Sequence, residues 1–346
     1  MNHVIVGDHC VFNKECMPDV QNTRKDFYPV PIKKVGVRNV EAPILVWQRD
    51  EEKAIQVHAT FSAYVELTED SKGINMSRNG RVIMEQAKKH MNIDLADMKS
   101  TNFNLVESIV RELQTQHKSK TAYVKCKFSY PSWTKVFASK LDTVEYVDIV
   151  WEAIADGDDV TELMTVENVG ISLCPCSKEM SLLTNNFDAR EKQIYESWVK
   201  HGHSNEAMEG IVAKISKAGF GAHNQRSHVA VTVQIIPNQQ VWFEDLIAIT
   251  DKSFSAPIRA ILKREDEKVE GELAYLGGYY DEYSFNKVEG TGPKFVEDIA
   301  RDAARQLDLL LDTKIADYII QVRNDESIHS RALEAVAVLT AGRNLQ

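Results

Sequence analysis

Two cysteines flank a proline in the sequence CPCSK, where Cys174 and Cys176 lie two positions apart. This spacing strains an intrachain disulfide, and it differs from the spacing of a C-x-x-C redox pair. A site with four thiolates needs more nearby cysteines than this chain has. Three alternatives stay open for the segment: one thiolate in a mixed metal site, a nucleophile, or no chemistry at all.

A second polar cluster, GAHNQRSH, comes directly before an apolar run. His223 has Asn224, Gln225 and Arg226 as its neighbours, and such neighbours can bind a substrate. We therefore expect His223 to be functional. His228 enters the apolar run itself, where a histidine is more often a structural hydrogen-bonding group.

Three further segments in the second half of the chain carry groups of the same kind. They are KREDE with Glu265 and Glu267, KFVED with Glu297, and ESIH with His329. Structural explanations exist, since KREDE can be a solvated helix end and Glu297 suits the first turn of a helix. A thiolate, imidazoles and a carboxylate together suit zinc, iron(II) or manganese. The residue types therefore predict a divalent metal site.

The elements that must position these residues follow the same order in both halves of the chain. In the first half the order is strand, strand, helix, helix, strand, strand, at 35–47, 54–67, 79–91, 105–117, 121–130 and 143–155. The second half has strands, then helical spacing interrupted before Pro257, then a helix and a strand, at 162–173, 227–236, 241–265, 293–311 and 317–327. We predict an α+β fold of two β-β-α-α-β-β units, with antiparallel sheets and helices on one face.

The predicted organisation is an N-terminal arm at 1–30, a first module at 31–155 and a second module at 156–346. Insertions near 182–220 and 276–292 interrupt the second module, and they either cover a site or decorate the surface. Sheets of four strands with helices on one face leave edges unpaired and one face bare. We therefore expect the chain to form an oligomer.

Composition narrows the class of protein. A net charge of −10 indicates no general nucleic-acid binding, and no apolar run is long enough to predict a membrane span. The N-terminus lacks a signal-peptide pattern, and five cysteines are an odd, sparse set, so we expect a reducing, cytoplasmic location. Cys126 alternates with apolar residues and is predicted to be a buried strand thiol. Cys10 and Cys16 receive no predicted role.

Together, MPDVQN, CPCSK, GAHNQRSH, KREDE, KFVED and ESIH resemble the type IB GTP cyclohydrolase family over roughly residues 17–335. The pairing of CPCSK with GAHNQRS is the specific part, and the long insertion between them departs from most bacterial members. The resemblance implies a tandem tunnelling fold and a homotetramer with active sites at interfaces. It also implies hydrolysis of GTP to formate and 7,8-dihydroneopterin triphosphate, the first step of folate biosynthesis.

The same resemblance implies roles for single residues. Cys174, His223 and His329 match ligands of one divalent metal per site, manganese, iron(II) or zinc, and the first two are the expected catalytic residues. Glu267 matches the carboxylate ligand, with Glu265 as the fallback. Glu297 matches the glutamate that anchors the purine.

The substrate's triphosphate needs a local basic cluster because the chain as a whole is acidic. The candidates are Lys178, Arg226 and Arg331.

Three alternatives compete with this interpretation. An archaeal-type cyclohydrolase forms a cyclic phosphate of dihydroneopterin and carries an HSQRGH-like segment in place of GAHNQRSH. A nitrile reductase of the same fold uses a cysteine nucleophile and NADPH and needs no metal. A zinc-binding interaction protein would hold its Cys and His in a closed site and bind no nucleotide.

Overall fold

The computed structural model describes most of the chain in twelve stretches: residues 5–6, 9–10, 21, 28–93, 105–183, 200, 222–276, 278–281, 286–289, 292–330, 333–343 and 345. Most of the predicted arm and of the insertion near 182–220 lies outside these residues, as do Cys16, Arg331 and part of the insertion near 276–292. The chain divides into two compact units, Met1–Phe128 with Val150–Leu163 and Ser129–Ile149 with Met164–Gln346. Three strands, β5, β6 and β7, contribute residues to both units.

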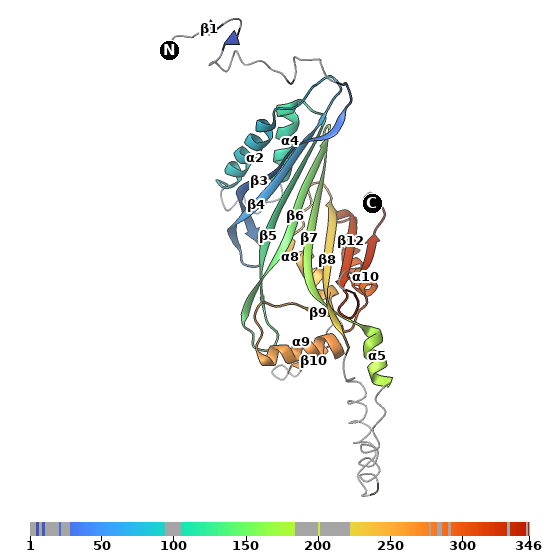
Figure 1. Cartoon of the computed structure of the whole chain (residues 1–346). Coiled ribbons are helices and arrows are strands. Elements are labelled where there is room, and N and C mark those ends of the chain that lie inside the picture. Colours follow the sequence, from blue (N-terminus) through green and yellow to red (C-terminus); the bar gives the residue numbers. More distant parts are fainter. Residues whose placement is uncertain are drawn as a thin grey trace. The chain divides into compact units, whose positions relative to one another are not determined.

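In the first unit two helices pack against two long strands. The elements are β3 (Ile32–Gln48), β4 (Lys53–Leu67), α2 (Met76–His90), α4 (Leu105–His117), and parts of β5 (Thr121–Lys135), β6 (Asp142–Asp156) and β7 (Asp159–Leu173). Figure 1 shows α2 and α4 together over one face of β3 and β4. Alternate residues of β4, including Phe61, Ala63 and Val65, are fully buried beneath them. The period-two pattern of the sequence is thus the pattern of burial.

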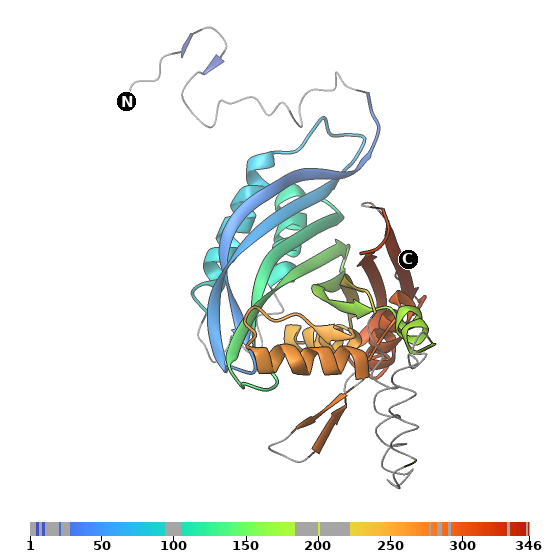
Figure 2. The same cartoon turned by 60° about the horizontal axis from the view of Figure 1, so that its bottom comes forward.

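The second unit has the same order with additions. It contains α5 (Pro175–Leu183), β8 (Asn224–Ile235), α8 (Phe243–Ser253), β9 (Ala256–Pro257), α9 (Arg264–Leu276), β10 (Gly278–Asp281), β11 (Asn286–Glu289), α10 (Val296–Leu307), β12 (Ile315–Asp325) and β13 (Glu334–Thr340). The helices α8 and α10 pack on each other and contact β8 and β12 respectively. In Figure 2, α9 is the orange helix, with the β10–β11 hairpin next to it.

The main sheet of the described residues has the strand order β13-β12-β8-β7-β6-β5-β4-β3, with β9 paired to β7. The β3–β4, β4–β5, β8–β12 and β12–β13 pairs are antiparallel. This confirms the predicted α+β class, with a large antiparallel sheet. Two β-β-α-α-β-β runs are also present, once α5, β9, α9 and the β10–β11 hairpin are counted as additions to the second. The prediction of a buried Cys126 is confirmed, and burial raises the pKa of its thiol.

Two local predictions differ from the structure. In the helical stretch expected over 241–265, the interruption predicted before Pro257 is present, because α8 ends at Ser253 and Ala256 and Pro257 pair with Ile171 and Gly170 of β7. The residues after it, 258–263, are not helical as expected, and α9 begins at Arg264. A side chain at Gly170 would meet the Phe254 ring at 2.2 Å, so glycine lets this ring cover the strand. The last strand, β13, was not predicted, although its residues alternate in exposure.

Within the described residues no helix is both long and apolar enough to span a membrane.

Candidate active site

Cys174 and His223 meet through the backbone, although the long insertion separates them in sequence. Cys174 follows β7 and precedes α5, and its N–H donates to the carbonyl oxygen of His223 at 3.2 Å. The N–H of Ser177 donates to the Cys174 Sγ at 3.4 Å, as a helix-capping contact does. The side chains of Cys174 and His223 are both half-buried. The insertion therefore leaves the ends of β7 and β8 together.

The ESIH segment lies beside His223. The hydroxyl oxygen of Ser327 is 3.4 Å from His223 Nδ1, and Gln225 Nε2 donates to Glu326 Oε1 at 3.4 Å. This segment follows β12, which pairs with β8. His329 is exposed two positions after Ser327. The pairing of β12 with β8 thus brings the segment that carries His329 next to His223.

The start of α10, which carries Glu297, is tied to the end of β7. The N–H of Lys294 donates to the carbonyl oxygen of Leu173 at 3.1 Å, and the Ser172 hydroxyl donates to the Lys294 carbonyl at 2.9 Å. Leu173 directly precedes Cys174, so the KFVED segment is anchored one residue from the CPCSK segment.

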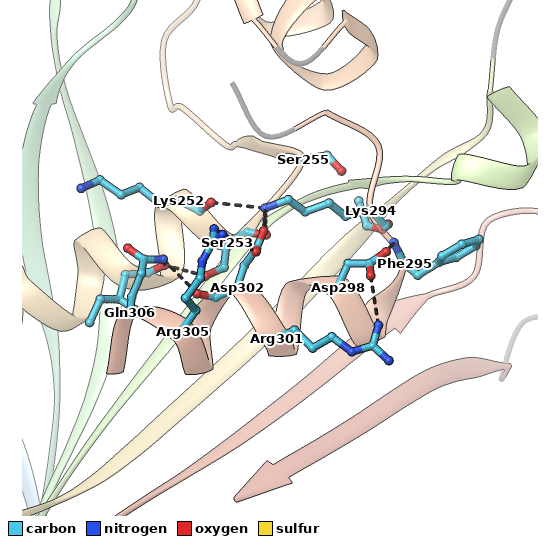
Figure 3. Close-up of polar contacts among 12 residues, drawn as sticks. Lys252, Ser253, Ser255, Lys294, Phe295, Asp298, Arg301, Asp302, Arg305 and Gln306 are labelled. Carbon is cyan, nitrogen blue, oxygen red and sulfur yellow. Dashed lines mark hydrogen bonds and ion pairs between the residues drawn. The ribbon is translucent and has the colours of Figure 1, made fainter. Parts of the chain in front are cut away.

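The side chain of the buried Lys294 links the start of α10 to α8 (Figure 3). The ammonium of Lys294 donates to the carbonyl of Ser253 at 2.8 Å, is 3.4 Å from the carbonyl of Lys252, and forms an ion pair with Asp302. Burial lowers the pKa of Lys294, and Asp302 opposes this effect. A cation at the carbonyl end of α8 matches the helix dipole. Lys294 therefore joins α8, α10 and β7.

Glu297 itself is exposed in the first turn of α10. The capping contact is made by its neighbour, because the Asp298 carboxylate accepts the N–H of Phe295 at 3.1 Å. Among the described residues none forms a hydrogen bond or ion pair with the Glu297 carboxylate. Asp298 thus forms the cap, and Glu297, which the helix dipole favours in this first turn, keeps an exposed carboxylate that a ligand can reach.

Glu265 and Glu267 occupy a different place. They are exposed in the first turn of α9, on either side of the buried Asp266. Asp266 accepts hydrogen bonds from the N–H groups of Ala138, Ser139 and Lys263 and from the Ser139 hydroxyl, at 2.7–3.1 Å. Burial acts to raise the pKa of Asp266, but these hydrogen bonds outweigh it and lower the pKa. Asp266 therefore fastens α9 to the β5–β6 connection.

The described residues of one chain bring together some predicted ligands and not others. Cys174 and His223 are adjacent, and the segment of His329 is in contact with His223. In the described stretches no three His, Cys, Asp or Glu side chains are close enough to hold a metal ion, so Glu267 does not form a cluster with Cys174 and His223.

The predicted basic residues are spread over separate elements. Arg226 is exposed on β8, and Lys178 is half-buried in α5, where its N–H donates to the Cys174 carbonyl at 3.1 Å. Arg331 falls outside the described residues. His228 binds Asp325, with Nε2 3.0 Å from Oδ2, which matches the structural role expected for it.

A hollow of about 480 Å³ opens beside the His223 segment. Its polar lining comes from Asn224, Gln225, Arg226, Arg259, Asp325 and Ser327.

Three residues near the site were not predicted from the sequence. One is Arg259, although a lone arginine in the apolar run APIRAIL is a visible signal. Lys294 and Asp266 were also not predicted, because each is a buried charge with an exposed neighbour and nothing in the sequence marks it as buried.

This chain is similar to several known proteins in sequence or in structure. The family described as type I GTP cyclohydrolase folE2 matches residues 17–277 and 279–337. GTP cyclohydrolase FolE2 of Thermosipho melanesiensis is 31% identical over 316 residues, which cover 91% of this chain and 95% of that protein. GTP cyclohydrolase MptA of Methanococcoides burtonii is 28% identical, covering 93% and 94%. A solved uricase from Arthrobacter globiformis aligns with a TM-score of 0.48 at 7% identity, covering 91% and 96%.

Proposed function

Because the chain belongs to the type I GTP cyclohydrolase folE2 family, we propose that it hydrolyses GTP to formate and 7,8-dihydroneopterin triphosphate, the entry reaction of folate synthesis. One structural observation carries this proposal. The pairing of Cys174 with His223, with Ser327 at the imidazole, joins three of the motif segments at one place in the fold.

The proposed metal ligands are Cys174, His223, His329 and Glu267, with Glu265 as the alternative carboxylate. A thiolate, two imidazoles and a carboxylate fit zinc, iron(II) or manganese. The adjacency of Cys174 and His223 supports this set. When bound, such an ion supplies a nucleophile for C8 of guanine at neutral pH, by lowering the pKa of water to about 7.

The remaining chemistry is assigned to this chain's own side chains. The Glu297 carboxylate can accept hydrogen bonds from N1–H and the 2-amino group of guanine, which selects guanine over adenine because adenine lacks that donor pair. Ser327, in contact with Nδ1, fixes the orientation of the His223 ring. Lys178, Arg226 and Arg331 are the proposed partners of the triphosphate.

Self-association as a homotetramer is part of the proposal. Edge strand β13 exposes Val336 and Val338, at 60% and 64% of their surface, and an exposed apolar edge favours pairing with another chain. Glu267 is separate from Cys174 and His223 in one chain, which is consistent with a site completed at a subunit boundary. We assign the reaction to the cytoplasm, where free thiols such as Cys126 stay reduced.

A second candidate is the archaeal-type reaction, which yields a cyclic phosphate. It is favoured by the match to MptA proteins at 28% and 27% identity, close to that of the FolE2 proteins. The GAHNQRSH segment of this chain favours the first candidate.

The test is to strip the purified protein of metal and incubate it anaerobically with GTP and each of manganese, iron(II) and zinc. Formate and the oxidised, fluorescent pterin are measured together. Formate with a neopterin triphosphate supports the proposal, and a cyclic phosphate supports the archaeal-type reaction. No turnover with any metal contradicts both, and NADPH consumption with 7-cyano-7-deazaguanine would instead identify a nitrile reductase.

A further inference from the structure

Arg259, an arginine with a nearly enclosed side chain, lies between β9 and α9, in a stretch without regular structure. Its side chain is only 7% exposed. Nη2 donates to Asp251 Oδ2 at 3.2 Å and Nη1 donates to the carbonyl of Ile258 at 3.0 Å. Asp251 is held in turn by Asn168, whose Nδ2 donates to Oδ1 at 2.9 Å. The guanidinium is therefore fixed in place by β7 and α8.

The fixed guanidinium has donors left over. An arginine carries five N–H donors in a rigid fork, and two hydrogen bonds are formed here. The Nε atom is buried, and in the described part of the chain it has no partner. Leaving a buried donor unpaired costs about 1–3 kcal/mol, more for a charged group. Because Nε is itself enclosed, the donors that a ligand in the neighbouring hollow can reach are the remaining N–H groups of Nη1 and Nη2.

The hollow beside His223 supplies the place for that acceptor. Arg259 and Arg226 both line it, together with Asn224 and Ser327. Its carboxylate, Asp325, is already paired, with His228 at 3.0 Å and with Arg323 at 3.5 Å. Two arginines against one carboxylate give this lining a net positive formal charge, and Asp251, the partner of Arg259, does not line this hollow.

The other side of Arg259 is different. A smaller hollow of about 260 Å³, which Arg226, His228 and Arg259 also line, has four carboxylates, so carboxylates outnumber arginines there by four to two: Glu145, Asp148, Glu167 and Asp251. One of these, Glu145, accepts the N–H of Ala260, and Asp251 is the partner of Arg259 itself. Negative charge on this side repels an anion. An anionic ligand is thus directed to the side of Asn224 and Ser327.

We infer that Arg259, with Arg226, binds the phosphate chain of the nucleotide substrate in the hollow beside His223. The inference rests on the proposed function for the identity of the nucleotide. A guanidinium is the side chain best matched to phosphate oxygens, because its fork donates two parallel hydrogen bonds. Anchoring by Asp251 means that little side-chain entropy is lost when the phosphate binds.

The experiment distinguishes binding of the phosphates from binding of the base, by comparing a nucleotide with its nucleoside. 7-Deaza-GTP carries the full triphosphate but has carbon in place of N7, so it lacks the N–C8–N unit that the reaction opens. Its dissociation constant and that of 7-deazaguanosine are measured by titration calorimetry on the metal-loaded protein. The variants are Arg259→Gln, Arg259→Lys and Arg226→Gln. Arg81→Gln, which removes an exposed arginine of α2 in the first unit, is the matched control.

We expect Arg259→Gln and Arg226→Gln each to weaken 7-deaza-GTP binding about 10- to 100-fold, the range for a hydrogen bond to a charged group. Arg259→Lys should restore part of the loss. Binding of 7-deazaguanosine should not change in any variant, and the control should match the wild type for both ligands. A misfolded variant would instead weaken both ligands, and the exposed Arg226 provides a test that does not depend on a buried residue.

Two results would overturn the inference: wild-type affinity for 7-deaza-GTP in Arg259→Gln, or an equal loss for the nucleoside in both Gln variants. Formate release by the wild type is measured separately. If the wild type releases no formate but its binding of 7-deaza-GTP still depends on Arg259, the proposed reaction is wrong and the proposed anion site stands. Formate release with unchanged binding in Arg259→Gln retains the reaction and removes Arg259 from the site.

Discussion

Replacing Lys294 by methionine tests how the junction of α8, α10 and β7 is held. Methionine keeps the unbranched length of the side chain and removes the ammonium. The change deletes the hydrogen bond to the Ser253 carbonyl and the ion pair with Asp302 (Figure 3). The backbone bonds of residue 294 to Ser172 and Leu173 do not depend on the side chain and should persist.

The magnitude follows from burial. Lys294 is 5% exposed, and removing one partner of a buried ion pair costs about 3–5 kcal/mol. Asp302 keeps 28% of its side chain in solvent, so it rehydrates in part. Burying the lysine charge also has a cost, which the variant no longer carries. We therefore expect the free energy of unfolding to fall by about 2–3 kcal/mol.

Urea unfolding at about pH 7 measures this change, with Lys252→Met as the control because Lys252 is an exposed lysine of the same helix end. The control should lose less than about 1 kcal/mol. The pH dependence adds a second test. The pKa of Lys294 is lowered from 10.5 in the folded state, so in the window below 10.5 the unfolded chain binds more protons. Wild-type stability relative to the variant should then rise with pH through this window.

Equal stability of Lys294→Met and the wild type at about pH 7 would show that desolvation cancels the ion pair and the hydrogen bond. A stability difference that shrinks as the pH rises towards 10.5 would contradict the assigned cause of the pKa shift.

Three further predictions concern other residues. Cys174→Ala should lose bound metal, measured by plasma emission, and formate release, whereas a fully active variant would remove Cys174 from the site. Glu297→Gln should reduce kcat/KM for GTP by at least about a hundredfold with little change in stability, because Asp298 forms the cap; unchanged kinetics would contradict the guanine contact. Burial, and then the charge of Glu107, raise the pKa of Glu162 from 4.5 to about 8, so the folded chain binds more protons than the unfolded chain between these pH values. The free energy of unfolding of the wild type should therefore fall as the pH rises from 4.5 to about 8. Glu162→Gln should lack this fall in urea unfolding, and an equal fall in both proteins would contradict it.

The sequence predicted the elements of the fold because burial follows period two in strands and a helical period in helices. In α4 the residues with the spacing of one helix face, Leu105, Ile109, Val110 and Leu113, are all buried. The residues after the interruption, 258–263, were predicted to return to helix because of their apolar spacing, whereas in the structure they follow the pairing of β9 with β7, a distant partner. Pairing between distant segments has no local signature.

The same limit applies to the candidate site. Residue types predicted which side chains can ligate a metal, but not that the exposed Glu267 would be positioned by its buried neighbour Asp266 on another part of the second unit. Arg259 has no motif around it, and its importance comes from the partners that hold it, Asp251 and Asn168. Such roles depend on three-dimensional contacts, which neither composition nor spacing contains.

The insertion between CPCSK and GAHNQRS gave a reason to doubt that Cys174 and His223 meet. Loop closure explains why they do. The entropy cost of a loop grows only with the logarithm of its length, about 0.6 kcal/mol for each doubling. Antiparallel pairing of β8 with β12 and the hydrogen bond between Cys174 and His223 fix both ends of the inserted segment. A long insertion at this point therefore costs little, so shortening it to a tight connection should preserve the Cys174–His223 pairing and bound metal, measured by plasma emission. Loss of metal on shortening would show that the insertion itself takes part in the site.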